Sequence, residues 1–339
     1  MTKTRKICYD RILPRDMNKV QRTRMIGGGR TRAISPIGKQ WINGSTIAIR
    51  FISGTQNQRD MVERFAPEWT EHANLKFEFT DHPRADIRVQ FDADDGAWSY
   101  VGTDNKNIPL HAATLNLGWQ DQGVILHEFG HMIGLSHEHQ NPEGGIVWNE
   151  QVVIDDLAGP PNFWTEAETR HNVLNKYSAD QVHGTDFDPA SVMLYAFPDE
   201  WTQNMGATTE NDDISELDRD FVRSEKMYPG RADPEERVLD LPVCTTTAAE
   251  IAVGGEEDLY RFKVTQEGQH VIETSGSTDV VLSLFGPDSL TQFLAEDDDG
   301  GVGRNARVDA DLQPGTYYAR VRHYSAAHTG EYRIRVTAA

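Results

Sequence analysis

The stretch that decides this chain is His127-Glu-Phe-Gly-His131-Met-Ile-Gly-Leu-Ser-His137. His127 and His131 are four residues apart, so both imidazoles leave the same face of a helix and can reach one metal ion. Gly134 ends this helix, because glycine accepts the left-handed turn that other residues resist. The turn brings back His137 as a third nitrogen ligand. Three histidines with an open fourth position are typical of a catalytic zinc site, whereas structural zinc sites have four protein ligands.

Glu128 directly follows the first of these histidines and is the predicted general base. On the helix it lies beside the metal, where a carboxylate can hold and deprotonate a zinc-bound water. The alternative is an amphipathic helix with histidines on its surface, but five specified residues at this spacing favour the metal site. The sequence therefore predicts a hydrolase with one catalytic zinc ion.

Length and composition are those of an ordinary globular protein with about two domains. The chain has 339 residues, of which 38% are hydrophobic and 25% are charged. No apolar stretch approaches the roughly 18–20 residues that span a bilayer, and residues 1–16 contain no apolar core of a secretory signal. Two cysteines, Cys8 and Cys244, are too few for a disulfide framework. We expect no membrane span.

The net charge of −20 is distributed unevenly along the chain. Residues 1–40 hold eleven Lys and Arg against two Asp and Glu, whereas residues 41–230 hold twelve against thirty-two and residues 231–339 hold ten against nineteen. A basic arm usually indicates binding to nucleic acid or to an anionic surface. Here its nearest large acidic partner is its own chain, so docking within the molecule is at least as well supported. The acidic remainder argues against a nucleic-acid enzyme, and no nucleic-acid partner is expected.

Hydrophobic periodicity predicts a mixed α/β domain over residues 41–230, after an N-terminal extension over residues 1–40. A long amphipathic helix is expected over residues 56–75, the metal-binding helix from about residue 122, and a capped helix from Ser215 to about residue 230. Between the metal-binding helix and the capped helix, the chain is expected to be rich in loops. The strands are expected over residues 46–51, 76–79, 85–91 and 113–117.

The polar residues 231–240 are interpreted as a linker, and the pattern beyond them changes to strands alone. Short alternating runs separated by Gly, Asp and Pro turns predict an antiparallel β-sandwich over residues 241–339. No catalytic group of residues is found in this second domain. Its strands are expected over residues 259–264, 270–274, 280–285, 316–322 and 330–336.

A second motif, Ser191-Val-Met193-Leu-Tyr195, makes the assignment more specific. The three-histidine motif followed by such a methionine turn is the metzincin pattern. With Glu138 directly after the third histidine and Tyr195 two residues after Met193, the chain resembles the astacin-like zinc metalloendopeptidases over about residues 40–230. It lacks the cysteines of animal astacins, which fits a bacterial-type, cysteine-poor branch. Residues 241–339 resemble the pre-peptidase C-terminal domain.

The resemblance implies an α+β metzincin-type catalytic domain with a twisted mixed sheet, an active-site helix and a loop-rich C-terminal half, followed by an all-β antiparallel sandwich. It implies that His127, His131 and His137 bind zinc and that Glu128 acts as general base and then as general acid. It also implies that residues 113–117 form the strand at the edge of the cleft, where a peptide substrate adds as a further strand.

Three further roles follow from the resemblance. Met193 forms the floor beneath the metal ligands. Tyr195 is a switchable metal ligand that also donates a hydrogen bond to the oxyanion, unless it is a buried aromatic residue of the turn. Glu138 contacts the N-terminus exposed by activation, or else it is a solvated charge. His139, His171 and His183 lack ligand spacing and are interpreted as ordinary polar residues.

The basic extension carries two residues that could hold the enzyme latent. Cys8 could bind the zinc ion through its thiolate and Asp10 through its carboxylate, which would make residues 1–40 an inhibitory pro-segment of a zymogen. The alternatives are a free cysteine without a role, or a disulfide between Cys8 and Cys244.

An oxygen-rich loop, Asp297-Asp-Asp299-Gly-Gly, lies in the second domain. Asp297, Asp298 and Asp299 could bind calcium, although the spacing fits no EF-hand and a solvated acidic turn is the more frequent explanation. We therefore expect a zinc ion, with a calcium ion as a second option.

The function that these predictions support is hydrolysis of peptide bonds in protein or peptide substrates by a secreted, monomeric endopeptidase. The alternative is a secreted adhesin or binding protein that attaches through its β-sandwich and retains an idle zinc scaffold. Glu128 discriminates between them, because a protein that only binds needs no general base. A serralysin-like metzincin is a third option, against which the missing glycine-rich calcium repeats argue.

Overall fold

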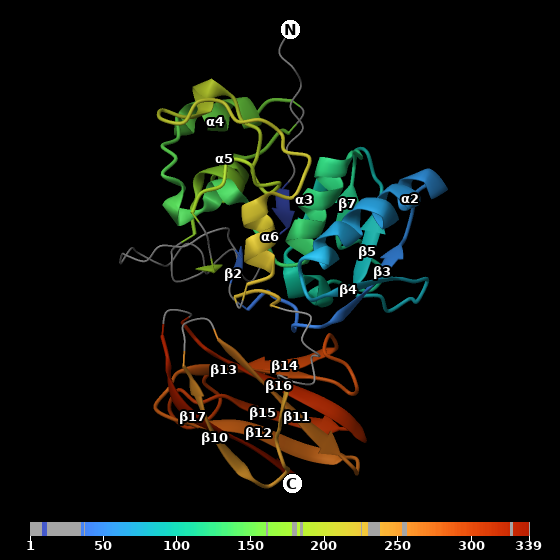
Figure 1. The fold of residues 1–339 in the computed structure, drawn as a ribbon, viewed down its shortest axis with the longest axis vertical. Coiled ribbons are helices and arrows are strands. Elements are labelled where there is room, and N and C mark those ends of the chain that lie inside the picture. The colour runs from blue at the N-terminus through green and yellow to red at the C-terminus, as the bar shows by residue number, and fades with distance from the viewer. Residues whose placement is uncertain are drawn as a thin grey trace. The chain divides into compact units, whose positions relative to one another are not determined.

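The structure is a computed structural model that describes residues 9–11, 35–36, 38–160, 162–177, 182–183, 186–224, 226–229, 238–252, 256–325 and 328–338. The chain forms two compact units that divide between Met227 and Tyr228, except that Ile42–Ser45 groups with the second unit (Figure 1). Within the described ranges, no helix is both long and apolar enough to cross a bilayer. Each unit is described by itself below.

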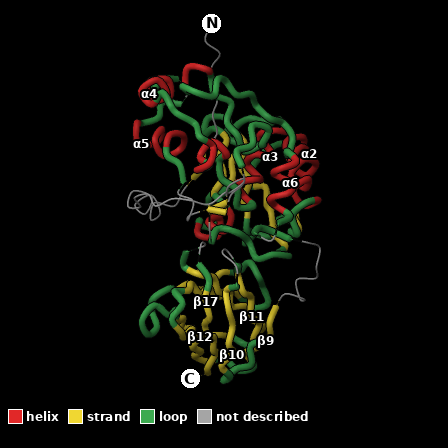
Figure 2. The backbone as a smooth tube through the Cα atoms, turned by 60° about the vertical axis from the view of Figure 1, so that its left-hand side comes forward, coloured by secondary structure: helices red, strands yellow, loops and turns green. Residues whose placement is uncertain are grey.

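The first unit is built on a six-stranded sheet with the order β1-β6-β7-β5-β3-β4. All neighbouring pairs are parallel except β6 with β7, which are antiparallel, so the predicted mixed sheet is confirmed. Helices α2 (Gln56–Phe65) and α3 (Gln122–Met132) lie side by side (Figure 2). Helix α3 also contacts β6 and β7. The strands are β1 (Tyr9–Arg11), β3 (Thr46–Phe51), β4 (Lys76–Phe79), β5 (Ile87–Gln90), β6 (Ala97–Tyr100) and β7 (Leu115–Leu117).

Two expectations for this unit are wrong. The long helix over residues 56–75 is interrupted, because α2 ends at Phe65 and the chain continues as the 3₁₀ helix Ala66–Glu71. Pro67 at its start has no backbone N–H and cannot extend the α-helical hydrogen bonding. The strand before the metal-binding helix is not at an edge either, because β7 lies between β5 and β6. Strand β6 was not predicted, and its other side is paired with β1.

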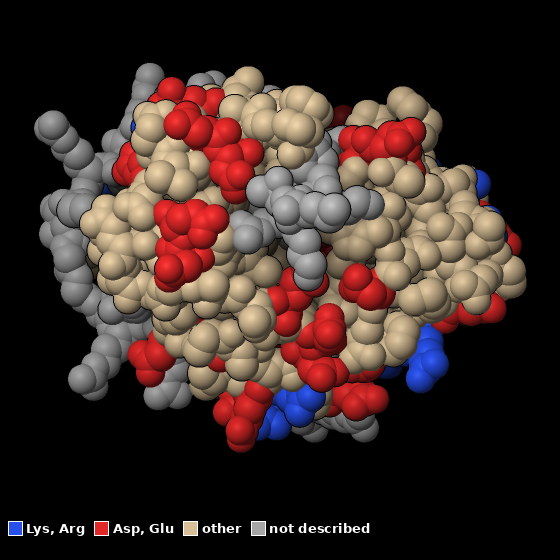
Figure 3. All heavy atoms as spheres, turned by 90° about the horizontal axis from the view of Figure 1, so that it is seen from above, with Lys and Arg blue, Asp and Glu red and all other residues tan. Residues whose placement is uncertain are grey.

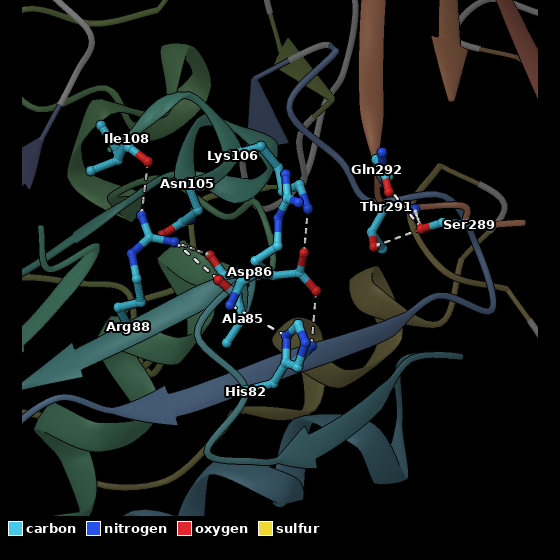
Figure 4. A network of polar contacts seen from close by, with 12 residues as sticks. His82, Ala85, Asp86, Arg88, Asn105, Lys106, Ile108, Ser289, Thr291 and Gln292 are labelled. Atoms are coloured by element: carbon cyan, nitrogen blue, oxygen red, sulfur yellow. Dashed lines mark hydrogen bonds and ion pairs between the residues drawn. The ribbon is translucent and has the colours of Figure 1, made fainter. Parts of the chain in front are cut away.

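A buried arginine holds the connection between β6 and β7. Arg88, on β5, donates hydrogen bonds to the backbone carbonyls of Ala85, Asp86, Ile108 and Ala112 at 2.7–3.2 Å. Figure 4 shows its guanidinium reaching the loop, with the ion pair between Lys106 and Asp86 beside it. A buried cation is stabilised by such a set of carbonyl acceptors, although burial still lowers the pKa of Arg88.

The second half of this unit contains more helix than the loop-rich segment that we expected. It includes α4 (Glu150–Leu157), α5 (Glu166–Thr169), a π-helix (Arg170–Leu174) and α6 (Glu216–Val222), which ends earlier than predicted. Apolar side chains of α4 and of the π-helix form a separate core with Trp148, Leu194, Phe197 and Trp201. Residues 145–215 hold thirteen Asp and Glu against two Lys and Arg, and Figure 3 shows a face of the molecule rich in acidic side chains.

The domain boundary predicted at residue 40 is too late. Strand β2 (Ser35–Pro36) pairs with β8 (Val182–His183), and the Ser35 hydroxyl donates to the carbonyl of Gly134 at 2.7 Å. The Trp41 indole N–H donates to the carbonyl of Met132 at 2.8 Å. The chain is therefore fixed to the end of α3 from Ser35 onward.

The second unit is the predicted β-sandwich. One sheet has the order β10-β17-β12-β15 and the other β14-β13-β16-β11-β9, with all pairs antiparallel except β9 with β11. Strand β9 (Val238–Asp240) shows that the predicted linker over 231–240 is too long. The inward-facing side chains of both sheets form one core. The other strands are β10 (Thr246–Ile251), β11 (Glu257–Val264), β12 (Gly268–Gly276), β13 (Val280–Phe285), β14 (Phe293–Asp297), β15 (Arg307–Leu312), β16 (Gly315–His323) and β17 (Gly330–Ala338).

Candidate functional site

The candidate site is carried by α3 and by the turn that follows it. Asp121 caps the helix, because its carboxylate accepts the backbone N–H of Val124 at 2.8 Å. Gly134 has a φ of 108°, a conformation that side chains with a Cβ rarely adopt. As predicted, it turns the chain so that His137 returns towards the helix, and Nε2 of His137 lies 3.1 Å from Nε2 of His131.

Backbone carbonyls fix which nitrogen of each helical histidine carries the proton. Nδ1 of His127 lies 2.7 Å from the carbonyl oxygen of Val192, and Nδ1 of His131 lies 2.9 Å from that of Leu135. A carbonyl only accepts hydrogen bonds, so both Nδ1 atoms must donate. Each Nε2 therefore presents a lone pair, as a metal-binding histidine requires.

The three histidines converge in a way that fits a zinc ion. Nε2 of His131 lies 3.0 Å from Nε2 of His127 and 3.1 Å from Nε2 of His137. Nitrogens about 2.0–2.1 Å from a tetrahedral zinc ion lie about 3.3 Å from one another, close to these separations. Among the described residues, this trio is the group of His, Cys, Asp and Glu side chains whose ligand atoms come together.

Burial keeps all three imidazoles neutral, which metal binding requires. It lowers the pKa of His127 to about 3 and the pKa of His131 to about 4, and it lowers the pKa of His137 well below its usual value. Glu128, on the same helix, is also fully buried. The site therefore presents neutral nitrogen ligands beside a carboxylate.

The turn Ser191–Tyr195 supports the ligands through its backbone. The carbonyl of Val192 accepts from His127, and the carbonyl of Met193 accepts the N–H of Glu138 at 3.0 Å. The Met193 side chain packs against α3 at Gly130, where an added Cβ would lie 2.4 Å from Sδ. This packing is consistent with the floor that the sequence predicted for Met193.

The rings of Tyr195 and His139 lie against His137, and no role was predicted for His139. The ring centroid of Tyr195 lies 4.1 Å from that of His137 and 6.2 Å from that of His127. His139, interpreted from sequence as an ordinary polar residue, is fully buried and stacks on Tyr195 at 4.4 Å. Its position two residues after His137 is the signal that could have identified it. His111 is exposed and His171 is half-buried.

Glu138 is buried, so a solvated charge is the wrong interpretation of this residue. Its Oε1 accepts the backbone N–H of Asp188 at 2.9 Å and the side-chain amide of Asn141 at 3.0 Å. Burial, with smaller contributions from the nearby carboxylates of Asp218 and Asp188, raises the pKa of Glu138 to about 8. Contact with an N-terminus remains a prediction.

Where the structure describes them, the other predicted site residues do not join the histidines. Cys8 lies outside the described residues. Asp10 lies in β1, opposite Ser99 of β6. Cys244 is free and exposed, so a Cys8–Cys244 disulfide is not formed. Asp297 to Asp299 do not bring ligand atoms together; instead Asp297 accepts the backbone N–H groups of Gly300 and Arg307 at 2.7 and 2.8 Å.

Comparisons with known proteins agree with this geometry. The chain is 33% identical to a solved structure of myroilysin, with a TM-score of 0.54, over 56% of this chain and 96% of that one. It is 29% identical over 133 residues to nematocyst expressed protein 6 of Nematostella vectensis, and 31% identical over 120 residues to zinc metalloproteinase nas-13 of Caenorhabditis elegans. These stretches cover 39% and 34% of this chain and only 38% and 23% of the two relatives.

Two family models match separate parts of the chain. The bacterial pre-peptidase C-terminal domain matches residues 256–323, within the sandwich. The model of the astacin peptidase family matches residues 33–216, which hold the three histidines, Glu128, Met193 and Tyr195. The start of this match agrees with a catalytic unit that is fixed in place from Ser35. By this match and by the geometry of its site, the chain belongs to the astacin family.

Proposed function

We propose that this protein is a zinc-dependent endopeptidase that hydrolyses peptide bonds of protein substrates. The observation that carries the proposal is the convergence of three Nε2 lone pairs, with carbonyl acceptors on the opposite nitrogens of His127 and His131. When bound, zinc polarises the scissile carbonyl and lowers the pKa of a coordinated water to about 7. Membership of the astacin family supports the same activity.

The residues of the chain divide the remaining work. His127, His131 and His137 hold the metal ion. The Glu128 carboxylate takes the proton of the attacking water and delivers it to the leaving amine, a transfer that general acid–base groups accelerate about 10²–10⁴-fold. The Tyr195 hydroxyl donates a hydrogen bond to the developing oxyanion, and Met193 keeps the floor of the site packed.

Comparison of Glu128 variants tests the activity. We expect the wild-type protein, after removal of residues 1–34, to digest casein and to lose this activity with a chelator. Glu128→Gln should lose at least about 10²-fold in kcat while it retains one equivalent of zinc. Glu63→Gln is the matched control, because Glu63 is exposed on α2. If the trimmed wild-type protein digests nothing, the adhesin alternative replaces the peptidase.

We also propose that the N-terminal segment keeps the enzyme latent until it is cleaved. Strand β1 pairs in parallel with β6, with Tyr9 opposite Trp98 and Arg11 opposite Tyr100. It therefore covers the edge of β6 that would otherwise be free to bind a peptide as an added strand. Strand β6 also contacts α3, which carries the proposed zinc ligands.

Trimming and point variants separate the parts of this latency. Deletion of residues 1–34 should raise kcat/KM at least about 10-fold, because the edge of β6 becomes free. Cys8→Ala and Asp10→Ala in the full-length chain test a side chain on the metal. If the two point variants keep the activity of the wild-type protein, neither residue is a switch. If the deletion of residues 1–34 also leaves kcat/KM unchanged, the segment is not inhibitory. Secretion of the protein stays a prediction from the family resemblance.

A further inference from the structure

A buried histidine that is not a proposed ligand lies against the proposed switch tyrosine. The ring centroid of His139 is 4.4 Å from that of Tyr195, with an angle of 27° between the planes. It is also 5.1 Å from that of His137, at 28°. With the 4.1 Å separation between His137 and Tyr195, the three rings form a compact triangle. His139 has no exposed surface.

The backbone fixes the orientation of the His139 ring. Nε2 of His139 lies 2.9 Å from the carbonyl oxygen of Asn172, so Nε2 carries the proton and donates it. Nδ1 is buried and has no hydrogen-bond partner among the described residues. The bond from Nε2 is therefore the hydrogen bond that orients the ring.

The acceptor belongs to an uncommon element. Asn172 lies in the π-helix Arg170–Leu174, whose wider turn is closed by the N–H of Asn175 donating to the carbonyl of Arg170 at 2.8 Å. π-helical turns are rare and frequently occur at functional sites. The Asn172 side chain also donates to the carbonyl of Glu168 at 3.0 Å, which ties the turn to α5. A continuous set of contacts therefore leads from α5 through Asn172 to His139 and Tyr195.

We propose that His139 is a positioning residue that holds the phenol ring of Tyr195 in the plane required by its switch. This proposal rests on the proposed role of Tyr195. Ring stacking is weak and directional, so it restricts tilting of the phenol without binding its hydroxyl in one place. His137 also touches Tyr195, but as a proposed ligand its position is set by the metal. The position of His139 is set instead by the protein, through its hydrogen bond to the carbonyl of Asn172 and its edge-on contact with Trp148.

A double-mutant cycle tests whether His139 acts through Tyr195. Tyr195→Phe should lower kcat about 10²-fold, as loss of an oxyanion donor does. His139→Ala should lower kcat about 10-fold with little change in KM, since a misplaced catalytic group loses rate before it loses substrate affinity. In the Tyr195→Phe background, His139→Ala should have no further effect. If the two losses multiply, His139 has only a structural role and the proposal is overturned.

A copper-substituted protein gives a readout that is independent of activity. Tyr195 on Cu(II) should produce a tyrosinate-to-copper charge-transfer absorption that Tyr195→Phe abolishes. His139→Gln keeps a side-chain donor for Asn172 but removes the ring, whereas His139→Phe keeps a flat ring but removes the donor. We expect the absorption to fall severalfold in His139→Gln and His139→Ala, and to fall less in His139→Phe, which keeps the stacked ring but loses the hydrogen bond that orients it.

The possible failures of the copper experiment are distinguishable. No charge-transfer absorption in the wild-type protein would overturn the role of Tyr195 and this proposal with it. An absorption that is present in the wild type and unchanged in His139→Gln and His139→Ala would overturn the positioning role alone. Copper content and melting temperature of each variant show that the metal site is intact in the samples compared.

Discussion

A single glycine allows the methionine turn to approach the metal-binding helix. Gly130 lies between His127 and His131 on α3, and a Cβ built there would lie 2.4 Å from Sδ of Met193 and 3.2 Å from Cζ2 of Trp69. Met193 and Trp69 are both buried, so neither side chain has space to move away. The absence of a side chain at this position therefore allows Met193 to pack directly against α3.

We expect Gly130→Ala to destabilise the protein although alanine is the better helix former. Overpacking of a core costs about 1–3 kcal/mol, whereas the gain in helix propensity is about 1 kcal/mol. In a Met193→Ala background the clash with sulfur is removed, so the same substitution should become neutral or stabilising. Urea denaturation of the wild type, the two single variants and the double variant measures the change in the free energy of unfolding that Gly130→Ala causes in each background. Equal costs in both backgrounds would show that the contact with Met193 does not determine the effect.

Some residues of the site can be predicted from the sequence, whereas others depend on contacts between distant parts of the chain. The proposed ligands and Glu128 are predictable because their spacing follows from helix geometry and from the glycine turn that ends the helix. The closeness of His139 to His137 in sequence hints at the site, but its proposed role depends on a carbonyl of Asn172, which lies 33 residues further along the chain. The burial of Glu138 likewise depends on Asp188, 50 residues away. Contacts of this kind leave no periodic trace in the sequence.

At the scale of elements, α6 holds the methionine turn in place. Ser215 and Asp218 form a capping box at the start of α6. The Asp218 carboxylate also accepts the hydroxyl of Ser191 at 2.8 Å and the N–H of Val192 at 3.0 Å. One buried carboxylate thus joins the closing helix to the backbone segment that orients His127.

This arrangement predicts a pH-dependent contribution to stability. Burial raises the pKa of Asp218 from 3.8 to about 6. Because the pKa is raised in the folded state, the contribution is fully present below pH 3.8 and is lost as the pH rises through about 6. Asp218→Asn has the same shape but does not ionise. We expect its stability relative to wild type to improve by about 2 kcal/mol between about pH 4 and pH 7.

Thermal melts of the wild type and Asp218→Asn over this pH range measure the effect. Asp218→Ala is the control, because it removes the hydrogen bonds and should be destabilised at every pH. A difference between wild type and Asp218→Asn that does not vary with pH would contradict the raised pKa.

The predicted elements differ from the observed ones mainly at their ends and edges. Strands β3 and β4 agree with the predicted alternation of more and less buried positions, and α3 begins where it was predicted, at Gln122. Helix α2 is shorter than predicted because Pro67 interrupts it. Strand β6 escaped prediction because three of its four residues are buried, which hides the alternation of a half-buried strand.

At the scale of the whole molecule, each unit has a core of its own. The sandwich buries residues from both of its sheets, and the second half of the catalytic unit is centred on Trp148 and Trp201. Domains with separate cores can unfold separately. The division into a mixed α/β domain and an all-β domain was predictable from the sequence. Helical and strand periodicities both occur up to about residue 230, whereas only the strand periodicity occurs beyond residue 240.

We therefore expect two thermal transitions, of which zinc stabilises only one. A chelator should lower the melting temperature of the catalytic unit, because ligand that binds only the folded state adds to its stability. The transition of the sandwich should not move. Differential scanning calorimetry of the full chain with and without chelator tests this, and addition of zinc to the chelated sample is the control. A single transition that shifts as a whole would mean that the two units unfold together.

The three proposed ligands lie within eleven residues, whereas Met193 and Tyr195 follow more than fifty residues later. A short loop costs less entropy to close than a long one. During synthesis, the ligand segment therefore leaves the ribosome and can capture zinc before the methionine turn has been translated. The carbonyl of Val192 that orients His127 belongs to that later turn, so the ligand segment is complete in sequence well before the backbone that sets its geometry is made.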